Sequence, residues 1–195
     1  ATSSLIKYAQ PNGSEGYTIF PVASTSLQSV WTTSDLLIDN TDPKYKYLVV
    51  TRGQVKFMAI NDKGTDDSGD DEVFTASQFL DQDNRTFRAE HYMCGVQDKI
   101  TGSLWIGTTS GPVVLPNPRN VFNSNYRCHR AKIARNNGTD EADYMLANEV
   151  ISTIAIDGDN RKWIGTEGSG AYLLSEDGTE TILHFTTDNS PILSN

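Results

Sequence analysis

The residues of this chain with the clearest capacity for chemistry are carboxylates gathered in one short segment. Residues 62–72 read Asp-Lys-Gly-Thr-Asp-Asp-Ser-Gly-Asp-Asp-Glu and hold six carboxylates in eleven positions. Carboxylate oxygens in a glycine-containing turn suit Ca²⁺, although the spacing does not match an EF-hand. The alternative, which we favour, is a solvated acidic loop between two strands. The calcium candidates are Asp66, Asp67, Asp70 and Glu72.

Histidine and cysteine form a second set of candidates, in the pairs His91-x-x-Cys94 and Cys128-His129. Such residues can bind zinc, but neighbours on a strand point to opposite faces, so four ligands would not converge. We place the two cysteines on the first and fourth strands of one sheet, about 14 Å apart, which is too far for a disulfide. We therefore predict free thiols, no metal site and no cofactor.

Signatures of catalysis are absent from the sequence. It contains no Gly-x-Ser-x-Gly elbow, no His-Glu-x-x-His and no glycine-rich phosphate loop with lysine. Its other carboxylate pairs, at 81–84 and 157–160, read Asp-x-Asp-Asn, and aspartate in such turns is explained by bonds to its own backbone. We expect a protein that is not an enzyme.

What positions these residues is an internal repeat. Trp-Ile-Gly-Thr occurs at 105–108 and at 163–166, and Tyr47 heads a weaker copy, so the aromatic residues are 58 apart each time (105 − 47 and 163 − 105). At repeat positions we assign structural roles: the aromatic ring fills space between units and glycine permits close approach. These residues are Tyr47, Gly53, Trp105, Gly107, Thr108, Gly111, Trp163, Gly165, Thr166 and Gly170.

The last copy shows what one unit is. Short β-branched and apolar runs at 151–157, 161–167, 171–175 and 181–185 are separated by Asp- and Gly-rich turns. Four short strands per unit without helical periodicity indicate a β-propeller blade. We predict an all-β fold, a propeller fragment with about three full four-stranded antiparallel blades and part of another.

The chain divides into blades as a single propeller fragment. We expect a partial blade at 1–33 and full blades at 34–82, 91–135 (with a link to 148) and 149–187; residues 188–195 begin a further blade. Such a piece is an open arc, so its terminal blades would each show an apolar face to solvent. We expect self-association through those faces, with Phe185 and Tyr172 near the contact.

The repeat resembles the two-component regulator propeller family, an extracytoplasmic sensor module of hybrid two-component systems. Residues 157–166, Asp-Gly-Asp-Asn-Arg-Lys-Trp-Ile-Gly-Thr, followed by Tyr172-Leu-Leu-Ser175 and by Asn189-Ser-Pro-Ile-Leu-Ser-Asn195, are most similar to its PorZ-like branch. That branch belongs to the type IX secretion surface complex. The resemblance covers residues 91–195 well and the earlier part weakly. It implies a propeller and a periplasmic or cell-surface location.

Charge and hydropathy exclude several classes of partner. The net charge is −9, which argues against nucleic acid and against adsorption to an anionic membrane. No apolar run is long enough to span a bilayer. The remaining partners are a glycan, another surface or periplasmic protein, and the other blades of a longer parent.

Propeller topology sorts the loops onto two sides. Turns after the first and third strands, including 62–72, lie on one anionic side, and turns after the second strand lie on the other with the links at 82–90 and 135–148. Insertions gather on the working face of a repeat scaffold. The predicted ligand-binding residues on that face are Arg52, Ser110, Glu167 and Ser169.

The function that these observations favour is recognition. We expect a non-enzymatic extracytoplasmic module that senses a ligand or binds a protein or glycan. One alternative is a PorZ-like component of type IX secretion, for surface glycolipid delivery or cargo attachment. A less favoured alternative is a propeller lyase or hydrolase.

Overall fold

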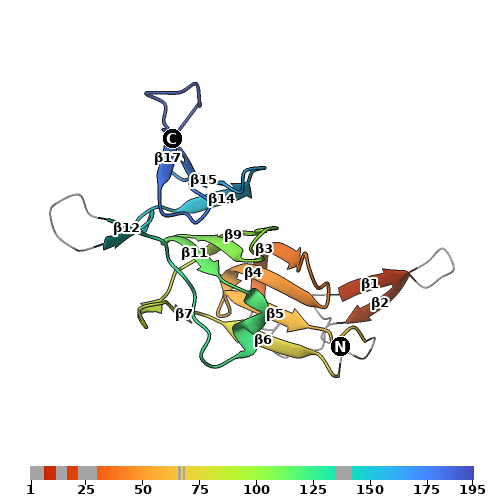
Figure 1. Cartoon of the computed structure of the whole chain (residues 1–195). Helices are drawn as coiled ribbons and strands as arrows, with labels where there is room; N and C mark the ends of the chain where they lie inside the picture. The colour runs from red at the N-terminus through yellow and green to blue at the C-terminus, as the bar shows by residue number, and fades with distance from the viewer. Residues whose placement is uncertain (1–6, 12–16, 22–29, 66, 68, 135–141) are drawn as a thin grey trace.

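The computed structural model describes residues 7–11, 17–21, 30–65, 67, 69–134 and 142–195, and their regular secondary structure is almost entirely β-strand (Figure 1). The only helix among them is the 3-10 helix η2 (Pro118–Phe122). The strands are β1 (Lys7–Pro11), β2 (Tyr17–Pro21), β3 (Val30–Ile38), β4 (Tyr45–Gly53), β5 (Phe57–Asn61), β6 (Glu72–Ala76), β7 (Phe79–Leu80), β8 (Thr86–Phe87), β9 (Tyr92–Gln97), β10 (Leu104–Thr108), β11 (Gly111–Leu115), β12 (Lys132–Ala134), β13 (Ala142–Tyr144), β14 (Ile151–Ile156), β15 (Lys162–Thr166), β16 (Ala171–Leu174) and β17 (Thr181–Phe185).

Three antiparallel sheets follow one another along the chain. Sheet I has the order β3-β4-β5-β6, sheet II the order β9-β10-β11 and sheet III the order β14-β15-β16-β17. The first strand of each sheet contacts the next, β3 against β9 and β9 against β14. The sheets form an open array rather than a closed ring (Figure 1). The predicted all-β fold of antiparallel sheets is confirmed.

Sheet II has three strands where four were expected. After β11 the chain enters η2 with a proline in its first turn, and proline lacks the N–H that a strand ladder needs. A single bridge takes the place of the fourth strand: Val114 N donates to His129 O (2.9 Å) and His129 N to Val114 O (2.8 Å). Two hairpins that the sequence did not predict, β7–β8 and β12–β13, lie in the links before and after sheet II.

The repeated aromatic residues occupy equivalent positions, as predicted. Tyr47, Trp105 and Trp163 all lie near the start of the second strand of their sheets. Tyr47 and Trp105 are buried, whereas Trp163 is half-buried. The cross-strand neighbours correspond in register: Leu37 and Ala59 for Tyr47, Val96 and Val114 for Trp105, and Ala155 and Leu173 for Trp163.

The sheets stack face to face through apolar cores. The Tyr47 face of sheet I packs against the face of sheet II that carries Leu104 and Ile106. The Trp105 face of sheet II packs against sheet III, on the face that carries Ile154 and Ile164. Burial of these large side chains supplies the main driving force for stacking.

The outer faces of the array differ at its two ends. A third cluster, on the far face of sheet I, is only 0–2% exposed; it comprises Leu48, Val50, Met58 and Ile60. The open face predicted for this end belongs to the partial blade at 1–33, most of which lies outside the described residues. On sheet III, Phe185 stacks on Trp163 with ring centroids 5.8 Å apart. Tyr172 packs into the core with sheet II instead and stacks on His184, so it does not lie on the outer face where we had expected it.

Close approach of sheets II and III requires glycine at one repeat position. A Cβ atom on Gly107 would lie 2.5 Å from Cys94 Sγ and 2.7 Å from Ile151 Cγ2. The first of these neighbours is in the same sheet and the second is in sheet III. The side chain is therefore absent because the next sheet occupies its space.

Replacing Gly107 with alanine tests this account. We expect Gly107→Ala to lower the free energy of unfolding by about 1–3 kcal/mol through overpacking, measured by urea denaturation. Gly158→Ala is the matched control, because a Cβ atom there meets nothing within 4 Å. Equal losses for the two variants would contradict the close-approach role of Gly107.

Aspartates at the ends of the first strands join each turn to the next sheet. Oδ1 of Asp39 and of Asp98 accepts two backbone N–H groups of the following turn at 2.8–3.0 Å. Oδ2 of Asp39 accepts a bond from Gln97 Nε2 (3.0 Å), and Oδ2 of Asp98 accepts one from Lys162 Nζ (2.8 Å). Burial alone would raise the pKa of both carboxyls, but these hydrogen bonds outweigh it and lower each pKa to about 2.

Removing one partner should therefore destabilise the stack. Lys162 and Asp98 are 0% and 1% exposed in their side chains, so Lys162→Met leaves an unpaired buried carboxylate and should cost about 3–5 kcal/mol at pH 7. The control Arg161→Met removes a partly exposed pair with Asp157 and should cost at most about 1 kcal/mol.

Acid should abolish the difference between wild type and Lys162→Met. A lowered pKa in the folded state stabilises the fold above the unfolded pKa, and this contribution is lost as pH falls through the folded value, here from about 4 to about 2. Denaturation midpoints measured across that range check the sign. A gap that stays constant down to pH 2 would contradict the assignment to Asp98.

Candidate functional site

The predicted binding residues lie in or beside turns between strands. In two of these turns, a threonine of the repeat accepts a hydrogen bond from the backbone of the turn. In the β10–β11 turn, Ser110 N donates to Thr108 Oγ1 (3.0 Å), and in the β15–β16 turn Ser169 N donates to Thr166 Oγ1 (3.0 Å). Glu167 is exposed in the same turn, and Arg52 is exposed near the end of β4. These positions face the side to which the links between sheets run, as topology requires.

The link into sheet III passes beside two of these turns. Gly111 N donates to Glu149 O (3.0 Å), and Glu167 N donates to Val150 O (3.0 Å). Gly111 has φ +84°, and a Cβ atom there would lie 2.6 Å from Leu146 O. The segment 146–150 is therefore packed tightly against the turns that carry Ser110 and Glu167.

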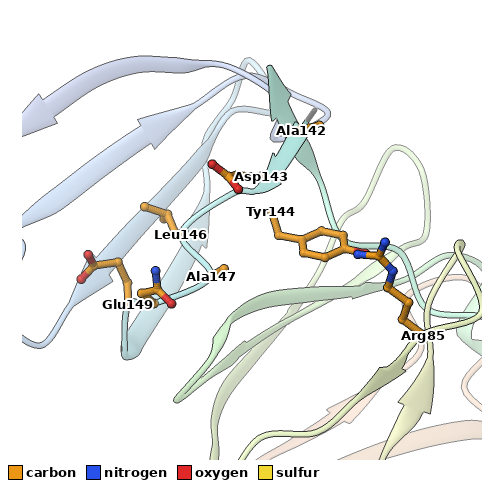
Figure 2. A pocket seen from close by; sticks show the side chains of 8 residues that line it. Arg85, Ala142, Asp143, Tyr144, Leu146, Ala147 and Glu149 are labelled. Atoms are coloured by element: carbon orange, nitrogen blue, oxygen red, sulfur yellow. The ribbon is translucent and has the colours of Figure 1, made fainter. Parts of the chain in front are cut away.

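A pocket of about 620 Å³ opens where this link meets the earlier one (Figure 2). Figure 2 shows Tyr144 extending from β13 toward Arg85, while Leu146 and Glu149 lie along the other wall. The lining residues come from the turn at 81–85 and from 142–149: Arg85, Ala142, Asp143, Tyr144, Leu146, Ala147, Asn148 and Glu149. None of Arg52, Ser110, Glu167 and Ser169 lines it, so their role in binding stays a prediction.

Tyr144 ties the two links together. Its hydroxyl donates to Asp81 Oδ2 (2.9 Å) and lies 3.0 Å from Asp83 Oδ2, across more than sixty residues of chain. Burial and then the two carboxylates raise the pKa of Tyr144 to about 12, so it remains a neutral donor. Oδ1 of Asp81 accepts the backbone N–H groups of Asp83 and Arg85 (both 2.9 Å), which fixes the turn that presents Arg85.

Arg130 packs against the same junction without lining the pocket. Its guanidinium lies 3.8 Å from the centroid of the Tyr144 ring and 4.8 Å from that of Phe87, a double cation–π contact. Gln82 bonds both the N–H and the carbonyl of Arg130 at 3.0 and 2.9 Å. Burial lowers the pKa of Arg130, and its Nε is buried without a hydrogen-bond partner.

The pocket suits binding by its chemistry. A guanidinium, a carboxamide, two carboxylates and a phenol line it beside a few small apolar groups. Polar groups of both charges around a partly apolar wall are suited to a polar, uncharged ligand that offers many donors and acceptors. The sequence predicted both links but not the residues that line the pocket, because contacts between links do not recur at the repeat spacing. The Asp-x-Asp-Asn turn at 81–84 was the one sequence feature that pointed to this place.

Among known proteins, no family model matches the chain and no curated protein matches it. A solved structure of PorZ, titled as an essential bacterial surface component of the type-IX secretion system of Porphyromonas gingivalis, superposes with a TM-score of 0.80. The identity is 24%, and the alignment covers 91% of this chain and 24% of that chain. The fold is shared, so the likeness to PorZ that the Trp-Ile-Gly-Thr repeat predicted is confirmed at the level of fold.

A second solved structure is the extracellular domain of BT3049, a putative hybrid two-component system from B. thetaiotaomicron. It has 14% identity and a TM-score of 0.38 over 92% of this chain and 25% of that chain. It belongs to the broader group that the sequence resembles, but at that TM-score it supports no further conclusion. This chain thus spans about a quarter of the length of either neighbour.

The acidic segment is held by the protein's own donors. Asp70 accepts a bond from Thr65 Oγ1 (2.8 Å), and Glu72 is paired with Lys63 Nζ (2.6 Å). Asp67 Oδ1 accepts Gly69 N (2.8 Å), while Asp66 lies outside the described residues. Across the described part of the chain, no three His, Cys, Asp or Glu side chains are grouped to hold a metal ion.

Asp71 is the exception in this segment that the sequence did not single out. Both of its carboxylate oxygens are buried without a hydrogen-bond partner. Burial, and then the neighbouring Asp62 and Asp70, raise its pKa. Burial and the crowding of like charges therefore favour the protonated form of Asp71.

Calcium titration tests this account of the loop. We expect calorimetry to show no Ca²⁺ site tighter than about 10⁻⁴ M, because Asp67, Asp70 and Glu72 already accept bonds within the loop and the described carboxylates are not grouped around a common point. A micromolar site that disappears in Asp70→Ala, but persists in the control Asp159→Ala on another turn, would contradict it.

Proposed function

We propose that the three sheets are blades of a β-propeller and that the protein is a non-enzymatic, extracytoplasmic recognition module. The observation that supports this is the pocket between the links, on the side of a rigid repeat scaffold where binding loops gather. The fold shared with a surface protein, PorZ, supports the location. In the described part of the chain no helix could cross a membrane.

The ligand class that we propose is a glycan. An oligosaccharide offers many hydroxyls that can accept from Arg85 and donate to carboxylates such as Glu149, both at the pocket wall. The net charge of −9 disfavours strongly anionic ligands at long range, and the pocket itself carries groups of both signs. Because contacts within the protein already hold the links in place, less conformational entropy is lost when a ligand binds.

Binding variants test the pocket directly. A glycan array would select an oligosaccharide, and calorimetry would then measure its affinity. We expect Arg85→Gln and Glu149→Gln each to weaken binding about tenfold or more, because each loses a charged hydrogen bond. Arg88→Gln is the matched control: Arg88 lies on the same link, is exposed and bonds only Gln78 in the described structure.

Two outcomes would contradict the proposed site. The first is a bound oligosaccharide whose affinity is unchanged in both pocket variants. The second is loss of binding when Asp159, in a turn on the opposite side, becomes asparagine. A combined substitution of Arg52 and Glu167 reports whether the neighbouring turns extend the site, as the sequence predicted.

A second candidate function is that of a PorZ-like component of type IX secretion, which delivers a surface glycolipid or attaches cargo. The superposition on PorZ over 91% of this chain favours it. Purified lipopolysaccharide in the same calorimeter separates the two. Binding of lipopolysaccharide but not of free oligosaccharides favours this second function, and the reverse favours the first.

A further inference from the structure

Sheet III departs from the repeat at one position of its third strand, β16. The residue of the third strand that pairs with the residue after the repeated aromatic is Met58 in sheet I and Val113 in sheet II, and both are 0% exposed. In sheet III this position holds Tyr172, which pairs with Ile164 and is only half-buried. A position that abandons the core pattern of its own repeat is a candidate for a function.

Tyr172 forms a stack with His184, its cross-strand partner on β17. The ring centroids are 3.9 Å apart and the ring planes differ by 10°. His184 is exposed, so its imidazole covers one face of the phenol and presents ring surface to solvent. The stack lies on the face of sheet III that packs against sheet II and the link, since Tyr172 contacts that core and Thr181 of β17 donates to Met145 Sδ (3.9 Å).

The β15–β16 turn holds the imidazole of His184 in place. His184 Nε2 lies 2.6 Å from the carbonyl oxygen of Ser169. A carbonyl can only accept, so we assign the proton to Nε2, which leaves Nδ1 of the neutral ring as an acceptor. The turn itself is packed against the end of β17, because a Cβ atom on Gly170 would clash with Phe185 O. The protein therefore fixes the orientation of this ring before any ligand binds.

The stacked rings adjoin the pocket through Glu149, which lines the pocket wall. Burial and then the charge of Glu149 raise the pKa of Tyr172, which places this carboxylate near the phenol. The backbones of the two segments are also joined, because Glu167 N donates to Val150 O (3.0 Å). Glu149 therefore stands between the pocket and the rings of Tyr172 and His184.

An exposed, oriented ring of this kind suits a sugar. A pyranose has a face of C–H bonds, which packs on an aromatic ring, and hydroxyls at its rim, which can donate to an imidazole nitrogen. In the pocket the aromatic ring is that of Tyr144, which already has the Arg130 guanidinium against it at 3.8 Å. The imidazole of His184 adds a stacking surface to the charged and amide groups that the pocket provides.

We propose that His184, stacked on Tyr172, forms a second sugar-binding subsite; this inference rests on the proposed glycan function. An oligosaccharide in the pocket continues past Glu149 and stacks one pyranose ring on the imidazole, and a hydroxyl of that ring donates to His184 Nδ1. Ser169, which the sequence predicted as a binding residue, is a positioning residue, because its carbonyl orients the imidazole. Fragments too short to pass Glu149 occupy the pocket alone.

Ligand length tests the subsite. The probes are the oligosaccharide selected on the glycan array and its mono- to hexasaccharide fragments, each titrated into the full chain by calorimetry. We expect His184→Ala to weaken only the longer fragments, about fivefold, which is the order of one aromatic contact. His184→Phe keeps a flat ring and should recover most of this loss. A purely structural role of the Nε2 bond to Ser169 would not be restored by phenylalanine.

Leu183→Ala is the matched control, because Leu183 is 48% exposed on the same strand and points to the opposite face; it should bind every fragment as wild type does. Equal affinities of wild type and His184→Ala for all fragments overturn the subsite, while sensitivity to Arg85→Gln leaves the proposed function standing. Long fragments that bind His184→Phe no better than His184→Ala also overturn it. If no oligosaccharide binds wild type, the proposed function fails and the subsite fails with it.

Discussion

The stack of sheets depends on one buried carboxylate per interface. Asp39 and Asp98 are almost wholly removed from water, and a charge in that position is tolerated only if donors surround it. One carboxylate oxygen accepts hydrogen bonds from the backbone of its own turn, and the other accepts a hydrogen bond from a side chain of the neighbouring sheet. Turn shape and inter-sheet register are therefore set by the same group. Because the links leave from the far ends of the sheets, this register also determines where the links meet.

The two interfaces share a hydrogen-bond donor beside an apolar side chain, not a particular residue. Gln97 with Leu104 and Ile156 with Lys162 each place one donor and one apolar side chain at the same point of the stack. An amide and an ammonium both satisfy a carboxylate, and the apolar member fills the space left by the other. Such exchange lets a repeat keep its geometry while its sequence drifts, which accords with a TM-score of 0.80 at 24% identity.

Much of the fold could be predicted from the sequence because its signals are local. The Trp-Ile-Gly-Thr motifs at 105–108 and 163–166, the glycines after them and the strand-ending aspartates recur once in each unit, so their spacing revealed the sheets and their order. The loss of the fourth strand of sheet II could not be predicted in this way, since it follows from the chain's path through η2.

The candidate site was predicted only as far as its side of the molecule. Tyr144 reaches Asp81 over more than sixty residues, and Arg130 lies between Tyr144 and Phe87, contacts that no spacing rule anticipates. Asp81, Arg130 and Phe87 do not line the pocket, but their contacts fix the segments that form its walls. Links without regular sheet structure would ordinarily be costly to order on binding. Here the Tyr144 hydroxyl, the stacked Arg130 guanidinium and the Asp81 turn order the segment that carries Arg85, and the bond from Gly111 N to Glu149 O orders the other wall. Under the proposed function, this order exists before a ligand binds.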